Sequence, residues 1–232
     1  MPEQLTFELA GAPPASFATF VSGPNAESVE AVIRIARHEA LETGVVLWGN
    51  AGAGKSHLLR AAVALAHELG REAIFLPDAA QLVDSAVAPS TLVAIDHVDR
   101  ANEEAQARLF TLYNVLAAGG GQLVAAAEVP PARMKLRDDL RTRLGWGLVY
   151  ELVPLADADK PAALAAFAQA RGFRLGADAI AYLLAHGRRD MASLVAMLTA
   201  LDRHSLALQR PVTVPLIREW LQRDMRLPPR DR

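Results

Sequence analysis

The chain has 232 residues, of which 52% are hydrophobic and 22% charged, so it has enough apolar material for one large or two small folded domains. A formal net charge of −2 excludes a global positive field that would attract nucleic acid, and the lack of cysteine excludes disulfides and thiolate metal sites. No basic residue precedes Arg34 and no apolar run is long enough to span a membrane, which predicts a cytoplasmic protein without a membrane partner.

Residues 1–15 are expected to form a flexible tail, because they contain Gly11 and the Pro13-Pro14 pair. Inside this tail the run from Gln4 to Leu9 alternates polar and apolar residues. Such alternation is typical of an extended peptide that adds to the surface of a partner protein. It is also compatible with a first strand of the chain's own sheet, so both interpretations stay open.

Five short apolar segments have the length and composition of buried strands. They alternate with helical patterns, including one near residues 26–42 and one that begins at Asn102 and ends at the glycines 119–121. This alternation predicts a mainly parallel sheet covered on both faces, in an α/β domain over residues 16–153. The predicted strands are residues 45–48, 73–76, 91–96, 122–127 and 148–152.

After Pro154 the pattern contains helices alone, which predicts a small all-helical domain over residues 154–232. Capping residues and glycines set the expected helix limits. The first helix is capped by Asp157 and ends at Gly172, the second covers 178–186, the third runs from Asp190 to about Leu208, and the last starts at Thr213.

One stretch matches the P-loop pattern G-x-x-x-x-G-K-[ST] at every fixed position, and it lies between a predicted strand and a predicted helix. In that setting backbone N–H groups and the helix N-terminus surround phosphate oxygens. The lysine reaches the β- and γ-phosphates, and the serine hydroxyl binds Mg²⁺. The sequence therefore predicts a site for ADP or ATP formed by Gly49, Asn50, Ala51, Gly52, Ala53, Gly54, Lys55 and Ser56.

A second nucleotide-site element is the apolar run that ends in Asp96, where a carboxylate would hold Mg²⁺ together with Ser56. The next residue is His97, at a position where related ATPases carry the acidic group that polarises water, and Asp99 is an unproven substitute. At the end of the fourth strand, Ala126 and Ala127 offer no hydrogen bond to a γ-phosphate. We expect tight nucleotide binding with weak intrinsic ATP hydrolysis.

Two arginines are candidate catalytic groups. Arg143, in the segment before the fifth strand, could extend to a neighbouring subunit's phosphates as an arginine finger, or could be one of several solvated surface arginines. Arg189, at a helix start in the second domain, could fold over the nucleotide or could simply solvate the helix end. Periodicity does not separate these alternatives.

In order along the chain, the P-loop, the Asp96 strand, the R-x-R-x-G-W-G segment at residues 141–147 and Arg189 resemble the AAA+ module of the DnaA-related family. Ser16 to Phe20, the run 109–114 and Pro130-Pro131 extend the resemblance over nearly the whole chain. The Gln-Leu tail, and a chain end where DnaA would continue into a DNA-binding domain, are similar to the Hda branch of that family.

The resemblance implies a P-loop AAA+ domain, a helical lid, and a regulator that stimulates hydrolysis of DnaA-bound ATP so that initiation is not repeated. It assigns Arg143 to the finger that acts on DnaA and Arg189 to sensor 2. It implies DnaA and the DNA polymerase III sliding clamp (beta subunit) as partners and no direct sequence-specific DNA binding, and it leaves a homodimer open. The clamp-binding residues would be Gln4, Leu5, Phe7 and Leu9.

Two other functions stay open from the residues. A self-sufficient ATPase of the helicase-loader type would turn over appreciably alone and would need a helicase-binding segment. A DnaA-like initiator paralogue would bind DNA in a strongly salt-dependent way. Neither a helicase-binding segment nor an added basic domain is visible in the sequence.

Overall fold

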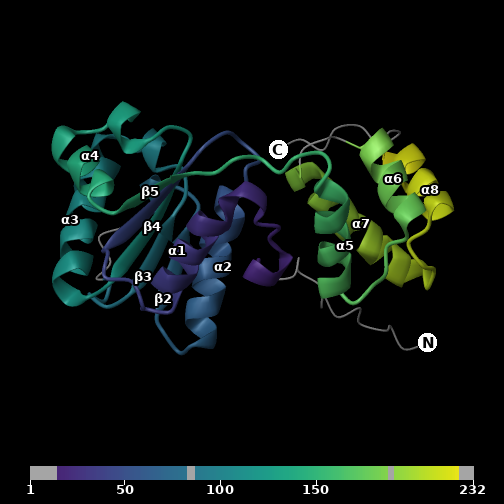
Figure 1. Cartoon of the computed structure of the whole chain (residues 1–232), viewed down its shortest axis with the longest axis horizontal. Coiled ribbons are helices and arrows are strands. Elements are labelled where there is room, and N and C mark those ends of the chain that lie inside the picture. The colour runs from purple at the N-terminus through teal and green to yellow at the C-terminus, as the bar shows by residue number, and fades with distance from the viewer. Residues whose placement is uncertain (1–14, 83–86, 188–190, 225–232) are drawn as a thin grey trace, which may run out of the picture. The chain divides into compact units, whose positions relative to one another are not determined.

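The structure is a computed structural model, and it describes residues 15–82, 87–187 and 191–224. These residues form two compact units, divided between Leu155 and Ala156 (Figure 1). The sequence places the boundary two residues earlier. The proposed clamp-binding residues Gln4, Leu5, Phe7 and Leu9, together with Arg189 and the cap Asp190, lie outside the described residues.

The first unit is built on a five-stranded sheet with the order β2-β3-β4-β1-β5, and every pairing in it is parallel (Figure 1). All five strands occur where the apolar segments predict them. The inner strands are buried on both faces, as continuous apolar runs require. The strands are β1 (Gly44–Trp48), β2 (Ala73–Leu76), β3 (Leu92–Ile95), β4 (Gln122–Ala127) and β5 (Leu148–Glu151).

Helices cover both faces of this sheet, because side chains of a strand point alternately to opposite sides. Val45 and Leu47 of β1 pack in the cluster with α1 and α2, whereas Val46 between them packs with α3 and α4. The sheet thus has two apolar cores. The four helices are α1 (Ala26–Ala36), α2 (Lys55–Glu68), α3 (Glu103–Gly119) and α4 (Asp138–Gly145).

The ends of these helices test the capping predictions. The Asn102 side chain accepts a hydrogen bond from the N–H of Ala105 at 2.9 Å, which confirms Asn102 as the N-cap of α3. The helix then ends in the predicted glycine run, where Gly120 takes the left-handed conformation (φ 75°). Helix α1 is shorter than predicted: it ends at Ala36 instead of residue 42, because His38 turns the chain with φ 60°.

The second unit contains four helices among its described residues, packed on a leucine-rich core that includes Leu164, Leu183 and Leu198. The predicted cap of its first helix is wrong. Asp157 forms an ion pair with Lys160 at 2.5 Å, and the helix begins after Asp159. No helix in the described part of the chain is both long and apolar enough to cross a membrane. The helices are α5 (Lys160–Ala170), α6 (Ala177–His186), α7 (Met191–Leu208) and α8 (Val214–Asp224).

Candidate nucleotide-binding site

The predicted P-loop connects the end of β1 to the start of α2, and its backbone can be formed only with glycine at key positions. Gly49 (φ 146°) and Gly54 (φ 98°) both have positive φ angles. A Cβ at Gly49 would lie 2.5 Å from the carbonyl oxygen of Leu152, and one at Gly54 would lie 2.6 Å from the ring of Phe20. The two glycines therefore fix a tight turn that presents the N-terminus of α2.

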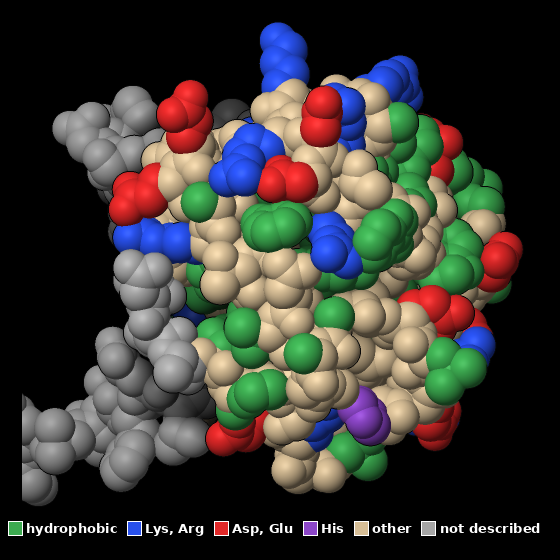
Figure 2. Space-filling model, turned by 90° about the vertical axis from the view of Figure 1, so that its left-hand side faces the viewer, with side chains coloured by type: hydrophobic (Ala, Val, Ile, Leu, Met, Phe, Trp, Pro, Cys, Tyr) green, Lys and Arg blue, Asp and Glu red, His purple; other side chains and the backbone are tan. Residues whose placement is uncertain are grey.

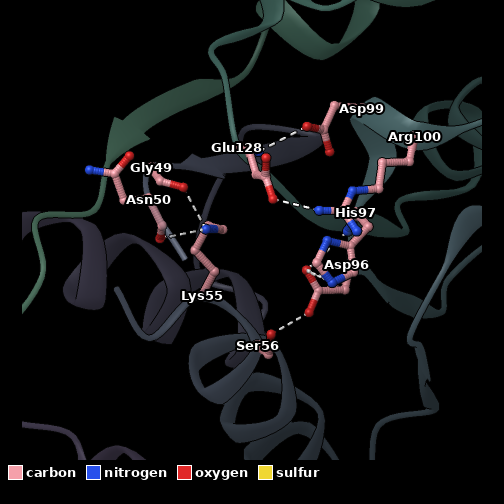
Figure 3. Close-up of polar contacts among 9 residues, drawn as sticks. All are labelled: Gly49, Asn50, Lys55, Ser56, Asp96, His97, Asp99, Arg100 and Glu128. Atoms are coloured by element: carbon pink, nitrogen blue, oxygen red, sulfur yellow. Dashed lines mark hydrogen bonds and ion pairs between the residues drawn. The ribbon is translucent and has the colours of Figure 1, made fainter. Parts of the chain in front are cut away.

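The Lys55 side chain lies inside this loop (Figure 3). Its Nζ donates hydrogen bonds to the carbonyl oxygens of Gly49 at 2.6 Å and of Asn50 at 3.0 Å, and the residue is only 7% exposed. Burial lowers the pKa of Lys55, while the carboxylates of Asp96, Glu128 and Asp99 oppose that shift. The ammonium is thus held against a loop whose concave side would receive phosphate.

The two predicted metal ligands lie in direct contact. Ser56 Oγ donates a hydrogen bond to Asp96 Oδ2, and the other carboxylate oxygen accepts the backbone N–H of His97 at 2.9 Å (Figure 3). Asp96 is 3% exposed at the end of β3. Hydroxyl and carboxylate oxygens are the ligands that Mg²⁺ prefers. Since α2 also has no side-chain cap at Gly54, its first N–H groups are available to an anion, and the residues fit a magnesium nucleotide.

The segment after Asp96 forms a small polar network with the end of β4 (Figure 3). His97 has φ 51°, and its Nε2 lies 3.9 Å from Asp96 Oδ1. Asp99 Oδ2 accepts the backbone N–H of Glu128 at 3.1 Å. Arg100 pairs with the Glu128 carboxylate at 2.5 Å.

Sequence reasoning missed Arg100 and Glu128. It considered Ala126 and Ala127 for the end of β4, but both side chains are fully buried in the two cores. The polar group at that strand end is Glu128, the next residue. The end of the apolar run was the signal, because the first residue beyond a strand buried on both faces is the first that can carry a charge without burying it.

A second feature missed from the sequence is the contact of the N-terminal turn with α2. His57 Nε2 donates to the carbonyl oxygen of Ser16 at 2.9 Å, and the His57 ring lies 5.6 Å from that of Phe20. Burial is the largest influence on His57 and lowers its pKa, which favours the neutral ring. Because Phe20 also touches Gly54, this turn packs directly on the P-loop. The sequence carries no local signal for this contact, because Ser16 and His57 lie far apart along the chain.

Arg143 lies in the last turn of α4, away from any carboxylate contact among the described residues. Its guanidinium carbon is 4.2 Å from the ring centroid of Trp146 and 5.9 Å from that of Phe110. In contrast, Arg141 on the same helix pairs with Asp138 at 2.6 Å. Arg143 is therefore neither buried in the P-loop site nor neutralised on the surface.

Comparisons with known proteins agree with this architecture. Residues 157–221 match the family model of the lid domain of Hda. Domain III of the Thermotoga maritima replication initiation protein DnaA aligns over 93% of this chain and 98% of its own, with a TM-score of 0.75 and 18% identity. AMPPCP-bound DnaA from Aquifex aeolicus has a TM-score of 0.64 and 21% identity, over 82% of this chain and 65% of its own.

A more distant likeness is the RuvB Holliday junction branch migration motor of Thermotoga maritima, with a TM-score of 0.61 and 15% identity over 90% of this chain and 72% of its own. At such sequence identities the solved structures show a shared fold alone. The match to the family model adds a sequence similarity between residues 157–221 and the lid domain of Hda. Taken together, the comparisons show that the chain shares the fold of domain III of DnaA and that residues 157–221 are similar to the lid domain of Hda.

Proposed function

We propose that this protein binds an adenine nucleotide with Mg²⁺ and, while attached to the DNA sliding clamp, stimulates hydrolysis of ATP bound to DnaA. The effect would be to prevent repeated initiation of DNA replication. The single observation that carries this proposal is Arg143: a partly exposed guanidinium, free of any described carboxylate, on an AAA+ domain with a P-loop site of its own.

The nucleotide part of the proposal is supported by three side chains. Lys55 supplies a cation inside the loop, and Ser56 with Asp96 supplies oxygen ligands for Mg²⁺. The fold is shared with a DnaA structure bound to AMPPCP. When bound, a magnesium nucleotide would supply phosphate charge that holds the loop, and Lys55 would exchange loop carbonyls for phosphate oxygens.

The regulatory part rests on an asymmetry between this site and an intact one. His97, in place of an acidic residue, is poorly suited to polarise water beside Mg²⁺. An arginine supplied in trans stabilises charge that develops on the γ-phosphoryl oxygens, and it can accelerate hydrolysis about 10³–10⁵-fold. A partner with a complete site would therefore profit from Arg143 more than this chain does.

Clamp attachment is proposed from the sequence of the tail. Gln4 would supply an amide for backbone hydrogen bonds, and Leu5, Phe7 and Leu9 would enter an apolar groove. Replacing Gln4 and Leu5 together with alanine should abolish capture by purified clamp and leave the melting temperature nearly unchanged. A large drop in melting temperature would instead favour an internal strand.

Single-turnover hydrolysis of ATP preloaded on DnaA, with clamp and DNA present, tests the whole proposal. Arg143→Ala should lower stimulation by at least about 10³-fold while ADP binding and clamp binding persist. Arg143→Lys should rescue poorly, because an ammonium lacks the forked donors of a guanidinium. Arg141→Ala is the matched control, since Arg141 lies on the same helix but pairs with Asp138.

Unchanged stimulation by Arg143→Ala would refute the finger role. Rapid ATP turnover by the purified protein alone would favour a self-sufficient ATPase, and salt-sensitive DNA binding without clamp would favour an initiator paralogue.

A further inference from the structure

We propose that Trp146 is a positioning residue for Arg143: its indole ring holds the guanidinium in an orientation that leaves the N–H donors free to reach a phosphate on another protein. This inference rests on the proposed function of Arg143 and adds the residue that prepares it. Trp146 itself is not expected to touch the phosphate.

The backbone places the ring and the guanidinium together. Trp146 is the C-cap of α4, and its backbone N–H donates to the carbonyl oxygen of Arg143 at 3.2 Å. Immediately after it, Gly147 packs so closely on β1 that a Cβ there would lie 2.0 Å from the carbonyl oxygen of Gly44. The ring is therefore carried by a backbone segment fixed on both sides.

Exposure shows that the ring is not a core residue. Trp146 is 65% exposed, although it is among the largest apolar side chains of the α/β unit. Figure 2 views this unit from the side of α3 and α4, where apolar and basic side chains are interspersed on the surface. An exposed indole beside a guanidinium gains a cation–π contact without burial, and that contact accounts for its position.

The way Arg143 is held differs from that of its neighbours. Arg137 and Arg141 direct N–H groups at the carboxylates of Asp139 and Asp138, both at 2.6 Å, so those donors are occupied. Arg143 instead lies over aromatic rings. A contact with a ring face stabilises the cation but leaves its N–H donors available for a bidentate contact with phosphate.

The contact with Trp146 should order the Arg143 side chain before it meets a phosphate. A long arginine side chain loses rotamer freedom when it docks, and a group that is already ordered loses less. Phe110 extends the aromatic surroundings on the α3 side. Because the guanidinium would act on charge that develops on the γ-phosphoryl oxygens in the transition state, this ordering should raise the maximal rate of stimulated hydrolysis more than the affinity between the two proteins.

The test measures single-turnover hydrolysis on ATP-loaded DnaA at increasing concentrations of this protein. Trp146→Ala should lower the maximal rate about tenfold, and the half-saturating concentration should change less than about threefold. Trp146→Phe should keep most of the rate, because a phenyl face still attracts a guanidinium. In the Arg143→Ala background, Trp146→Ala should cause no further loss.

A second readout does not depend on DnaA. In protein labelled with ¹⁵N-arginine, the Arg143 side-chain resonance should be displaced upfield by the indole ring current. It should return toward the random-coil position in Trp146→Ala and stay displaced in a control with Leu41→Ala, which removes a 99% exposed side chain of the turn before β1.

Two results would overturn the inference: an undisplaced Arg143 resonance, and a full maximal rate with Trp146→Ala. If that full rate were accompanied by a raised half-saturating concentration, Trp146 would be a docking anchor instead. If the unaltered protein fails to stimulate DnaA while the resonance is displaced, the proposed function falls and only the ring contact stands.

Discussion

Two cations of the α/β unit, Lys55 and Arg143, are held in opposite ways. Lys55 is 7% exposed and donates to the carbonyl oxygens of the loop that precedes it. Arg143 is partly exposed and rests on two aromatic rings, without a described carboxylate. The Lys55 ammonium is directed into its own chain, whereas the Arg143 guanidinium is not, and this difference fits the proposal that the protein holds one nucleotide and acts on another.

The two regions are linked by β5. This strand follows directly after the segment that carries Arg143 and Trp146, and it pairs with β1. At its end, the carbonyl oxygen of Leu152 lies against Gly49, the first residue of the P-loop. The P-loop site and the region of Arg143 are therefore connected through one parallel pair of strands, β1 and β5.

After the loss of stimulation expected for Arg143→Ala, the next largest expected effect is on ADP affinity, which should depend on Lys55 but not on Arg143. Lys55→Ala should weaken ADP binding about a hundredfold or more, because it removes a charge-assisted contact to phosphate worth roughly 3 kcal/mol. Arg143→Ala should leave ADP affinity within about twofold. Isothermal calorimetry measures both, with the exposed Lys135→Ala as control. Undiminished ADP affinity in Lys55→Ala would show that the Lys55 ammonium does not contribute to nucleotide binding.

A second effect of similar size concerns turnover. The isolated protein should hydrolyse ATP far below 1 s⁻¹, since one missing polar contact to the transition state lowers a rate about a hundredfold. The missing contact is the acidic group replaced by His97. Release of labelled phosphate from ATP measures this rate. Steady turnover near 1 s⁻¹ would show that Asp99 or Glu128 supports catalysis and that the site also serves itself.

The link between the sites can be tested through stability. Gly49→Ala should lower the free energy of unfolding by about 2–4 kcal/mol, because it combines a positive φ with a Cβ 2.5 Å from the Leu152 carbonyl oxygen. Gly52→Ala is the matched control: its φ is also positive, at 80°, but nothing lies within 4 Å of the added Cβ. Its expected loss is about 1 kcal/mol. Equal losses in urea denaturation would show that the contact with Leu152 carries no energy.

The sequence was most informative where structure is local. All five strands, the cap at Asn102 and the P-loop occur as predicted, since each depends on periodicity or on a short pattern. The length of α1 was wrong because its end depends on a left-handed turn at His38, which no glycine announces. The cap at Asp157 was wrong because the helix begins only after Asp159.

Parts of the candidate site depend on contacts between distant segments, and these were beyond reach. Arg100, after β3, donates a hydrogen bond to Glu128, after β4. His57 in α2 donates one to the carbonyl oxygen of Ser16, which is far from it in the sequence. For Arg143 the sequence left finger and surface residue as alternatives, and it did not show the aromatic contacts of the guanidinium, because these include Phe110 of another helix. Chain order alone does not show which side chains converge.

The smallest expected effect concerns the N-terminal turn that packs on the P-loop. Burial holds the pKa of His57 below its ordinary value, so at pH values below about 6.5 the unfolded chain binds more protons than the folded one. Stability should therefore fall as pH decreases through 6.5, and it should level off below the folded pKa. His57→Gln keeps a donor for the Ser16 carbonyl oxygen but does not titrate.

The difference between the unfolding free energies at pH 7.5 and 5.5 should then be smaller in His57→Gln than in the unaltered protein, by up to about 1 kcal/mol. His38→Asn, at an exposed turn position whose left-handed backbone asparagine tolerates, should leave that difference unchanged. If the stability of His57→Gln has the same pH dependence as that of the unaltered protein, protonation of His57 does not lower the free energy of unfolding. The contact between the N-terminal turn and the P-loop would then survive a charged ring, which the hydrogen bond to Ser16 favours and the nearby cation Arg60 opposes.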